Sequence, residues 1–179
     1  ANEAAYDAVY TRKVADILSA GLALRCIDSI LAANAQVGAL DAKPGTSIAG
    51  DFNLLYTKDF TGGQTPINLR LGMNVSNIGA KISYTNSNNQ DFIPTNLRLG
   101  TAIKADMDEY NSITFLADVN KLMVPTEGGQ SDKTLIDGMF SSFADAPGGF
   151  SEEMQEFTLS AGLEYWYNDL FAARAGLFL

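Results

Sequence analysis

The 179-residue sequence contains no histidine and only one cysteine, Cys26. Histidine is the commonest general base and metal ligand, and both Ser-His-Asp and Cys-His catalytic arrangements require it. A lone cysteine forms no internal disulfide, and Cys26 has neither a second cysteine nor a histidine to support redox chemistry. We therefore expect no catalytic residues, no metal site and no cofactor, and we interpret the chain as a non-enzymatic protein.

Basic residues and long apolar runs are also scarce. Lys and Arg number 12 against 21 Asp and Glu, which gives a net charge of -9 and argues against a nucleic-acid partner. No run approaches the roughly 20 apolar residues that a membrane-spanning helix needs. The sequence opens at Ala1 and closes within an apolar alternation, and we expect both ends to be truncated.

The sequence is rich in alternating apolar and polar residues. From Leu69 to Val75 every odd position is apolar, while the even positions are polar or glycine. A period of two is typical of a β-strand with one covered face. The pattern predicts eight strands, most with about the 9 to 11 residues that cross a bilayer when tilted. They are Glu3–Tyr10, Leu18–Ile30, Ser47–Tyr56, Asn68–Ile78, Asn96–Asp106, Ser112–Asn120, Glu156–Tyr167 and Phe171–Leu179.

Short and long connections alternate between these strands. The short ones, near 12–17, 57–66, 107–111 and 168–169, carry Asp, Asn and Gly turn residues, whereas 31–46, 79–93 and 121–153 are longer. Outer-membrane barrels have this asymmetry, with short periplasmic turns and long extracellular loops. We predict an all-β fold, a single antiparallel transmembrane β-barrel domain over residues 1–179, with 121–153 as a long extracellular loop.

Alternation alone does not say which face is covered, because a soluble barrel of the lipocalin kind points its apolar side chains inward. Two further features favour lipid on the outside. The apolar positions in the middle of the strands hold almost no charge, and a Lys or Arg facing lipid there would cost about 2 to 4 kcal/mol. Aromatic residues such as Tyr56, Tyr110 and Trp166 gather near strand ends, as in interfacial girdles.

Four arginines lie on the polar face, and each has an acidic residue near the mirror position across a short turn. Opposed side chains of antiparallel strands are within reach of an ion pair. We predict four pairs facing the lumen, although solvated charges on a polar face would give the same pattern. The pairs are Arg25 with Asp7, Arg70 with Asp51, Arg98 with Asp118 and Arg174 with Glu164.

The loop 121–153 has a helical spacing of apolar residues between Thr134 and Pro147, which predicts a short helix. Long loops on a rigid scaffold commonly carry recognition, so its apolar residues and those just before the strand at Asn96 are candidates for partner binding. Packing onto the barrel rim explains the apolar residues of the loop equally well, and the residues before Asn96 could instead fix the entry of the chain into that strand. The candidates are Phe92, Ile93, Pro94, Met139, Phe140, Phe143, Pro147 and Phe150. The nearby glutamates 152, 153 and 156 indicate a solvated acidic rim rather than a cation site.

Four phrases of the sequence, Asn74–Tyr84, Asp91–Gly100, Phe143–Phe150 and Glu164–Asn168, resemble the PorV family, also called LptO. This family belongs to the type IX secretion system of the Bacteroidetes outer membrane. Its barrels are similar to those of the FadL-like fatty acid transporters, which have fourteen strands. The resemblance therefore implies that the eight strands form part of a larger barrel.

The resemblance also implies a function in protein secretion. Members bind the folded C-terminal signal domain of cargo and pass it from the Sov (SprA) translocon to the PorU attachment complex, with outer-membrane lipid around the barrel. Two alternatives remain open at this point. A barrel of this architecture could transport hydrophobic small molecules, and eight strands alone could close into a small structural barrel.

Overall fold

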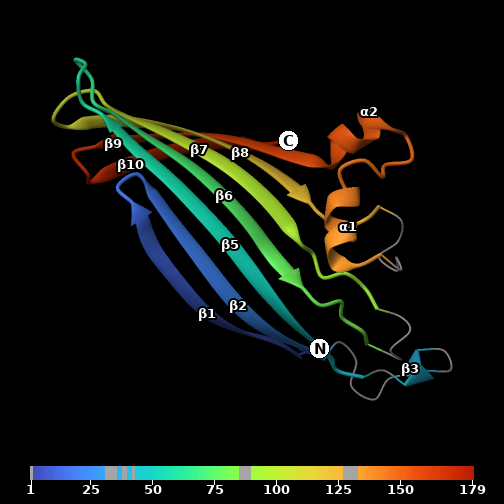
Figure 1. Ribbon diagram of the computed structural model, residues 1–179. Helices are drawn as coiled ribbons and strands as arrows, with labels where there is room; N and C mark the ends of the chain where they lie inside the picture. The colour runs from blue at the N-terminus through green and yellow to red at the C-terminus, as the bar shows by residue number, and fades with distance from the viewer. Residues whose placement is uncertain (1, 31–35, 38–39, 42, 85–89, 127–132) are drawn as a thin grey trace.

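The computed structural model describes residues 2–30, 36–37, 40–41, 43–84, 90–126 and 133–179. Eight strands form one antiparallel sheet in the order β1-β2-β5-β6-β7-β8-β9-β10 (Figure 1). Their bounds are β1 Asn2–Ala15, β2 Leu18–Ile30, β5 Gly45–Phe60, β6 Ile67–Gly79, β7 Asn96–Asp106, β8 Asn111–Leu122, β9 Phe157–Tyr167 and β10 Phe171–Phe178. The other elements are β3 Gln36–Val37, β4 Leu40–Asp41, helices α1 Leu135–Ser141 and α2 Phe150–Glu153, and the 3₁₀-helix η1 Met154–Glu156.

The prediction of eight antiparallel strands is confirmed, and each strand pairs with the next one in the main sheet. Strands β1, β5, β6 and β8 are longer than the alternation indicated, whereas β2 and β7 have the predicted bounds and β9 and β10 are each one residue shorter. β1 continues through Arg12 and Lys13, which oppose Ala20 and Ser19 in register. A backbone ladder needs no apolar side chain, so apolar periodicity marks the middle of a strand better than its ends. The small β3–β4 hairpin was not predicted.

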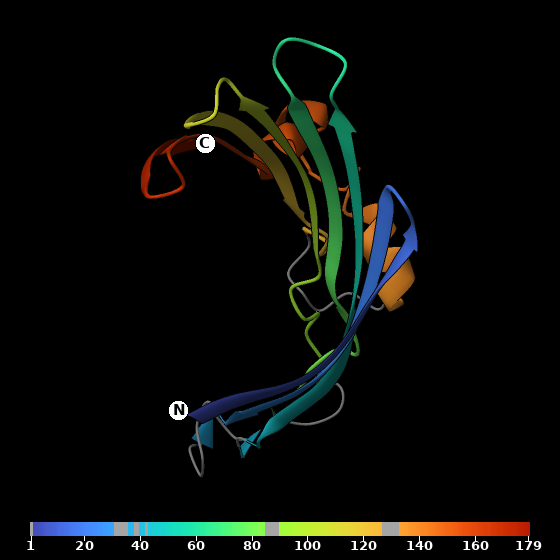
Figure 2. The same cartoon turned by 90° about the vertical axis from the view of Figure 1, so that its left-hand side faces the viewer.

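The sheet is bent into a trough (Figure 2). β1 and β10 lie at its two edges and do not pair with each other within the described residues. The eight strands therefore do not close on themselves, and a small eight-stranded barrel is not what these residues form. Among the described residues there is no helix with the length and apolar character needed to cross a membrane.

The two faces of the sheet differ in the polarity of their side chains and in how exposed those side chains are. On β2, Leu24 is 65% exposed while Ala23, on the other face, is only 9% exposed. On β8, Phe115 is exposed and its neighbour Thr114 is buried. A curved sheet spreads side chains on its convex side and crowds them on its concave side. The apolar face is therefore convex and the polar face is concave.

Short turns join strands at one end of the trough, and the long connections and helices lie at the other (Figure 1). Asn168 and Asp169, in the turn before β10, both have a positive φ, of 51° and 52°. In the turn before β8, the Asp108 carboxylate accepts hydrogen bonds from the backbone N–H groups of Tyr110 and Asn111, each at 2.8 Å. These donors favour the charged form and lower the pKa of Asp108.

A small core lies at the end with the long connections. Ala49, Ile82 and Ile93 are buried together, and Ile27 and Tyr84 pack against them. Lys43 N–H donates to the Tyr84 carbonyl at 2.8 Å, and Ile82 and Asp91 form an isolated bridge between two connections. This packing fixes the described parts of these connections to the ends of β2, β5 and β7.

Candidate functional site

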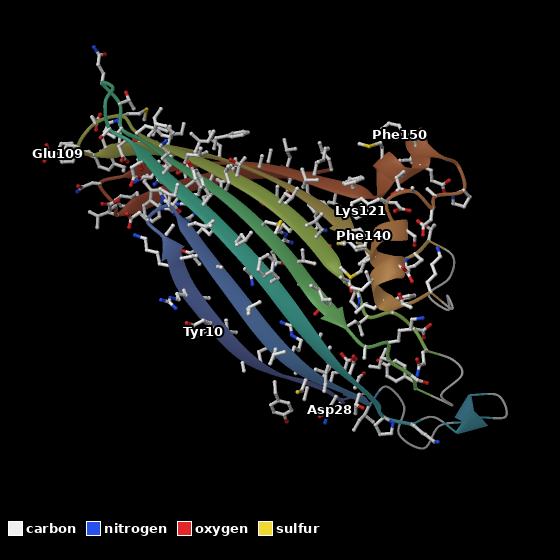
Figure 3. The ribbon with its side chains drawn as sticks, viewed as in Figure 1. Tyr10, Asp28, Glu109, Lys121, Phe140 and Phe150 are labelled. Carbon is white, nitrogen blue, oxygen red and sulfur yellow. The ribbon has the colours of Figure 1, made fainter. Side chains whose placement is uncertain are left out.

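Residues 133–156, which we call the rim segment, carry α1, α2 and η1 at the end of the sheet (Figure 3). Thr134 caps α1, because its side chain accepts from the Asp137 backbone N–H and donates to the Asp137 carboxylate. Gly138 lets α1 approach its support closely, since a Cβ there would come within 2.9 Å of the Phe92 ring. α1 is therefore packed against the chain that leads into β7.

Lys121, near the end of β8, anchors the rim segment. Its side chain is 1% exposed, and its Nζ lies 2.7 Å from Glu153 Oε1 and 2.7 Å from Glu156 Oε2. The ammonium also lies 5.4 Å from the centroid of the Phe143 ring and 5.0 Å from that of Phe157. The Lys121 ammonium at the end of β8 thus contacts two carboxylates and one aromatic ring of the rim segment, and a second ring at the start of β9.

Further donors hold the two glutamates. The Thr126 hydroxyl lies 3.0 Å from Glu156 Oε1 and 2.9 Å from Asp145 Oδ1, and its N–H donates to Asp145 Oδ2 at 3.2 Å. The Ala146 N–H donates to Glu153 Oε2 at 3.3 Å. The cluster of Lys121, Thr126, Asp145, Glu153 and Glu156, which we call the lysine clasp, therefore ties the beginning, middle and end of the loop to one point.

The lysine clasp corrects the interpretation of a solvated acidic rim. Glu153 is buried and Glu156 is partly buried, and both bind Lys121; Glu152 alone of the three is exposed. Sequence reasoning missed Lys121, although one signal was present. Lys121 follows Val119 by two positions and so is a cation on the otherwise apolar face of its strand.

The residues predicted to bind a partner divide into exposed and buried sets. Phe140 and Phe150 are strongly exposed, and Phe143 is less exposed, at 37%. Ile93 and Met139 are buried in the packing of the rim, as the alternative interpretation of rim packing expects, and partner binding by these two residues stays a prediction.

The other candidates have local roles. The Phe92 ring supports Gly138 and lies 4.2 Å from Lys81 Nζ, and the Pro94 carbonyl accepts from Asn77 Nδ2 at 3.1 Å. Pro147 is exposed. Ile136 and Met154, which the sequence did not single out, are exposed apolar side chains on the same segment. Ile136, Phe140 and Phe143 follow each other at intervals of four and three residues, which puts them on one side of the helical turn.

The concave face carries the predicted charge pairs, two of which are formed. Arg25 Nε lies 2.7 Å from Asp7 Oδ1, in the register Asp7 opposite Arg25. Arg174 and Glu164 also oppose each other and form an ion pair. These pairs link β1 to β2 and β9 to β10.

The other two pairs do not form as predicted. Arg70 opposes Thr57 and bonds the side chain of Asn68 at 2.8 Å. The β5–β6 ladder continues as far as Phe60 opposite Ile67, so Asp51 lies several positions away along β5 from the residue that faces Arg70. Asp51 instead accepts from the Asn77 backbone N–H at 2.7 Å and lies 3.5 Å from Arg25 Nη2.

Asp118 opposes Gly100 rather than Arg98, which is opposite Asn120. Arg98 and Asp118 nevertheless share a hollow of about 490 Å³ on the concave face. Its polar-face lining comes from six strands and includes Thr11, Gly21, Asn53, Asn74, Gly72 and Gly100. The hollow shows that the concave side is open along the middle of the sheet.

The rim of the sheet has features that suit binding. In the part of the chain that the structure describes, no three His, Cys, Asp or Glu side chains are placed to hold a metal ion. What the structure presents is a rigid scaffold with exposed apolar side chains on a clasped segment at one rim. This is the arrangement by which loops on a scaffold recognise other molecules.

Comparison with known proteins identifies the family. The model of the family described as type IX secretion system protein PorV matches residues 1–128, whereas no curated protein matches the chain. The match covers β1 to β8 and ends before α1, so the rim segment lies beyond the matched residues. Because the matched range is more than half of the 179 residues, this chain belongs to the PorV family of type IX secretion system proteins.

Proposed function

We propose that this chain is part of the wall of an outer-membrane β-barrel that receives the C-terminal signal domains of secreted cargo. In this role it passes cargo from the Sov (SprA) translocon to the PorU attachment complex and performs no catalysis. The family supplies the secretion system, and the exposed apolar side chains of the clasped rim segment carry the proposal for cargo.

Membrane insertion is supported by the two faces of the sheet. Large apolar side chains are exposed on the convex face of all eight strands, and examples from β2, β5, β6, β7, β8, β9 and β10 are Leu24, Ile48, Leu71, Leu99, Phe115, Leu163 and Leu177. A soluble monomer rarely exposes an apolar surface of this extent. Tyr56, Tyr165 and Tyr167 lie on the same face near the short turns, where an aromatic girdle would meet the interface.

Barrel closure would require further strands beside β1 and β10. We propose that the complete barrel has fourteen strands, in the manner of FadL-like transporters. The bend of the eight-stranded sheet and its two unpaired edges, among the described residues, support a larger cylinder. A density map of the full-length protein in lipid tests this, because a count other than fourteen would overturn the proposal.

The cargo surface lies on α1. Ile136 and Phe140 are one helical turn apart, both are exposed, and neither belongs to the lysine clasp. Phe143 is less suitable for a test, because its ring also lies over Lys121 and its loss would disturb the clasp. Apolar side chains presented on a rigid turn supply binding energy at a low cost in entropy.

The experiment compares two double variants in co-purification with a cargo signal domain. Ile136→Ser with Phe140→Ser removes the rim surface, and we expect the retained cargo to be largely lost. Ile17→Ser with Phe60→Ser removes an exposed isoleucine and phenylalanine at the opposite end, and we expect it to retain cargo like the wild type. If the Ile136→Ser, Phe140→Ser variant retained as much cargo as the control variant, α1 would be rejected as the cargo surface.

A further inference from the structure

α2 and η1 form one short amphipathic turn. Phe150 is 81% exposed and Met154, four residues later, is also exposed. Glu153 and Glu156 lie on the other side of the turn and bind Lys121. The acids therefore face the sheet, and the two apolar side chains face away from it.

The lysine clasp fixes this turn against the convex wall. Lys121 opposes Leu97 on β7 and Phe157 on β9, and it has the same parity as Val119, so it belongs to the apolar face. Lys121 and Phe150 lie at the same end of the sheet, opposite Glu109 in its short turn (Figure 3). The turn thus stands at the outer side of the rim and does not bend over the concave side.

The exposed apolar surface continues from this turn onto the sheet. Val119 and Leu159 oppose each other beside the clasp, both are exposed, and Leu163 follows on the same face. This surface runs around the convex wall as far as β2, where Leu22 and Leu24 are exposed. A single protein partner would cover one side of such a wall, whereas lipid covers all of it.

We propose that the α2–η1 turn is a lipid anchor at the outer-leaflet interface, with Phe150 and Met154 inserted at the boundary between headgroups and acyl chains. This inference rests on the proposed membrane location. Short amphipathic segments bind in this way through their apolar side. Glu153 and Glu156 bind the ammonium of Lys121, so this cation of the apolar face is paired where it meets the turn.

Fluorescent labels on single cysteines test the anchor in the full-length protein. The native Cys26 is exposed on the apolar face of β2, where it lies beside Tyr6 and Ile48. A label on Cys26 therefore measures whether lipid covers the convex wall. Cys26→Ser combined with Phe150→Cys places the label in the α2–η1 turn and measures its contact with lipid. Cys26→Ser combined with Glu109→Cys places the label in a short turn that we expect to lie in water. Each labelled protein is reconstituted in phosphatidylcholine vesicles with or without a nitroxide at the top of the acyl chain.

We expect the nitroxide lipid to quench the label at 150 as strongly as the label at 26, and to leave the label at 109 bright. Quenching at 26 together with a bright label at 150 would overturn the anchor and leave the barrel wall standing. Bright labels at both 26 and 150 would overturn the anchor and the membrane location together. As a second variant, Lys121→Glu in the 150-labelled protein should abolish its quenching, and unchanged quenching would overturn the role of the clasp.

Discussion

Lys121 is the residue on which the position of the rim segment depends. A buried ammonium loses its hydration, and here two carboxylates and two aromatic rings replace the water. Removing one partner of such a group leaves the others buried and uncompensated, which costs more than the pair itself contributes. Lys121 is thus a main anchor of the loop, beside the packing of α1 against Phe92.

Lys121→Met should therefore detach the rim segment. We expect a loss of about 3 to 5 kcal/mol in the stability of the segment, because the buried Glu153 and the partly buried Glu156 would be left without their cation. Hydrogen exchange at the buried Met139 and Ser142 amides measures this opening, since fraying of α1 exposes them.

Lys104→Met is the control, because Lys104 pairs with Asp106 at 2.9 Å in a partly exposed position, and it should change stability by about 0 to 1 kcal/mol. Adding Glu153→Gln and Glu156→Gln to Lys121→Met should recover protection, since the buried negative charge is gone. Equal exchange in Lys121→Met and Lys104→Met would show that the clasp contributes little.

Among the elements, β5 and β6 meet where the chain has no room for a side chain. A Cβ on Gly79 would come within 2.4 Å of the Ile48 carbonyl oxygen and 2.7 Å of the Ala49 Cα, both backbone atoms. Backbone atoms of a paired strand cannot move aside without breaking the ladder. Gly79 thus fixes the close approach of the two strands beside the buried Ala49 and Ile93.

Gly79→Ala should destabilise the sheet by about 1 to 3 kcal/mol, which is the usual cost of overpacking. Gly72→Ala is the matched control on the same strand, because a Cβ there meets nothing within 4 Å. We expect Gly72→Ala to be neutral or to add up to about 1 kcal/mol, since alanine loses less backbone entropy than glycine in a strand. Urea unfolding in detergent measures both, and equal midpoints would contradict the close packing at Gly79.

The sequence predicted the elements better than it predicted their contacts. Alternation located all eight strands, because a covered face imposes a period of two. It did not predict β3–β4, which are too short to show a period, or the extension of β1 through Arg12 and Lys13. The Arg70–Asp51 pair failed because the β5–β6 ladder runs on to Phe60 opposite Ile67 and puts Thr57, not Asp51, opposite Arg70. Alternation gives the face of each residue but does not locate the turn that sets the register.

For the molecule as a whole, the direction in which the sheet bends decides which face lies outside and which lines the interior. The same alternating strands would serve a soluble barrel if the apolar side were concave. Here the apolar side is convex, which follows from exposure of Leu22 and Leu24 beside the buried Ala23. The site could not be predicted in the same way, because burial of Ile93 and Met139 and exposure of Phe140 depend on how the rim segment folds back.

A pair of leucines tests which face lipid covers. Leu99 on the convex face of β7 is 45% exposed, and Leu55 on the concave face of β5 is 44% exposed. They lie at similar depth, since Leu55 opposes Gly72 and Gly72 opposes Gly100, the neighbour of Leu99. If hydrocarbon covers the convex face, Leu99→Arg should cost about 2 to 4 kcal/mol in unfolding from lipid vesicles.

Leu55→Arg should change the same free energy by less than about 1 kcal/mol, because the concave face already carries Arg98, Asn53 and Asp118 in an open hollow. A larger penalty at Leu55 than at Leu99 would mean that the concave side is the apolar one. The barrel, the lipid anchor and the cargo surface at the rim would then all have to be abandoned.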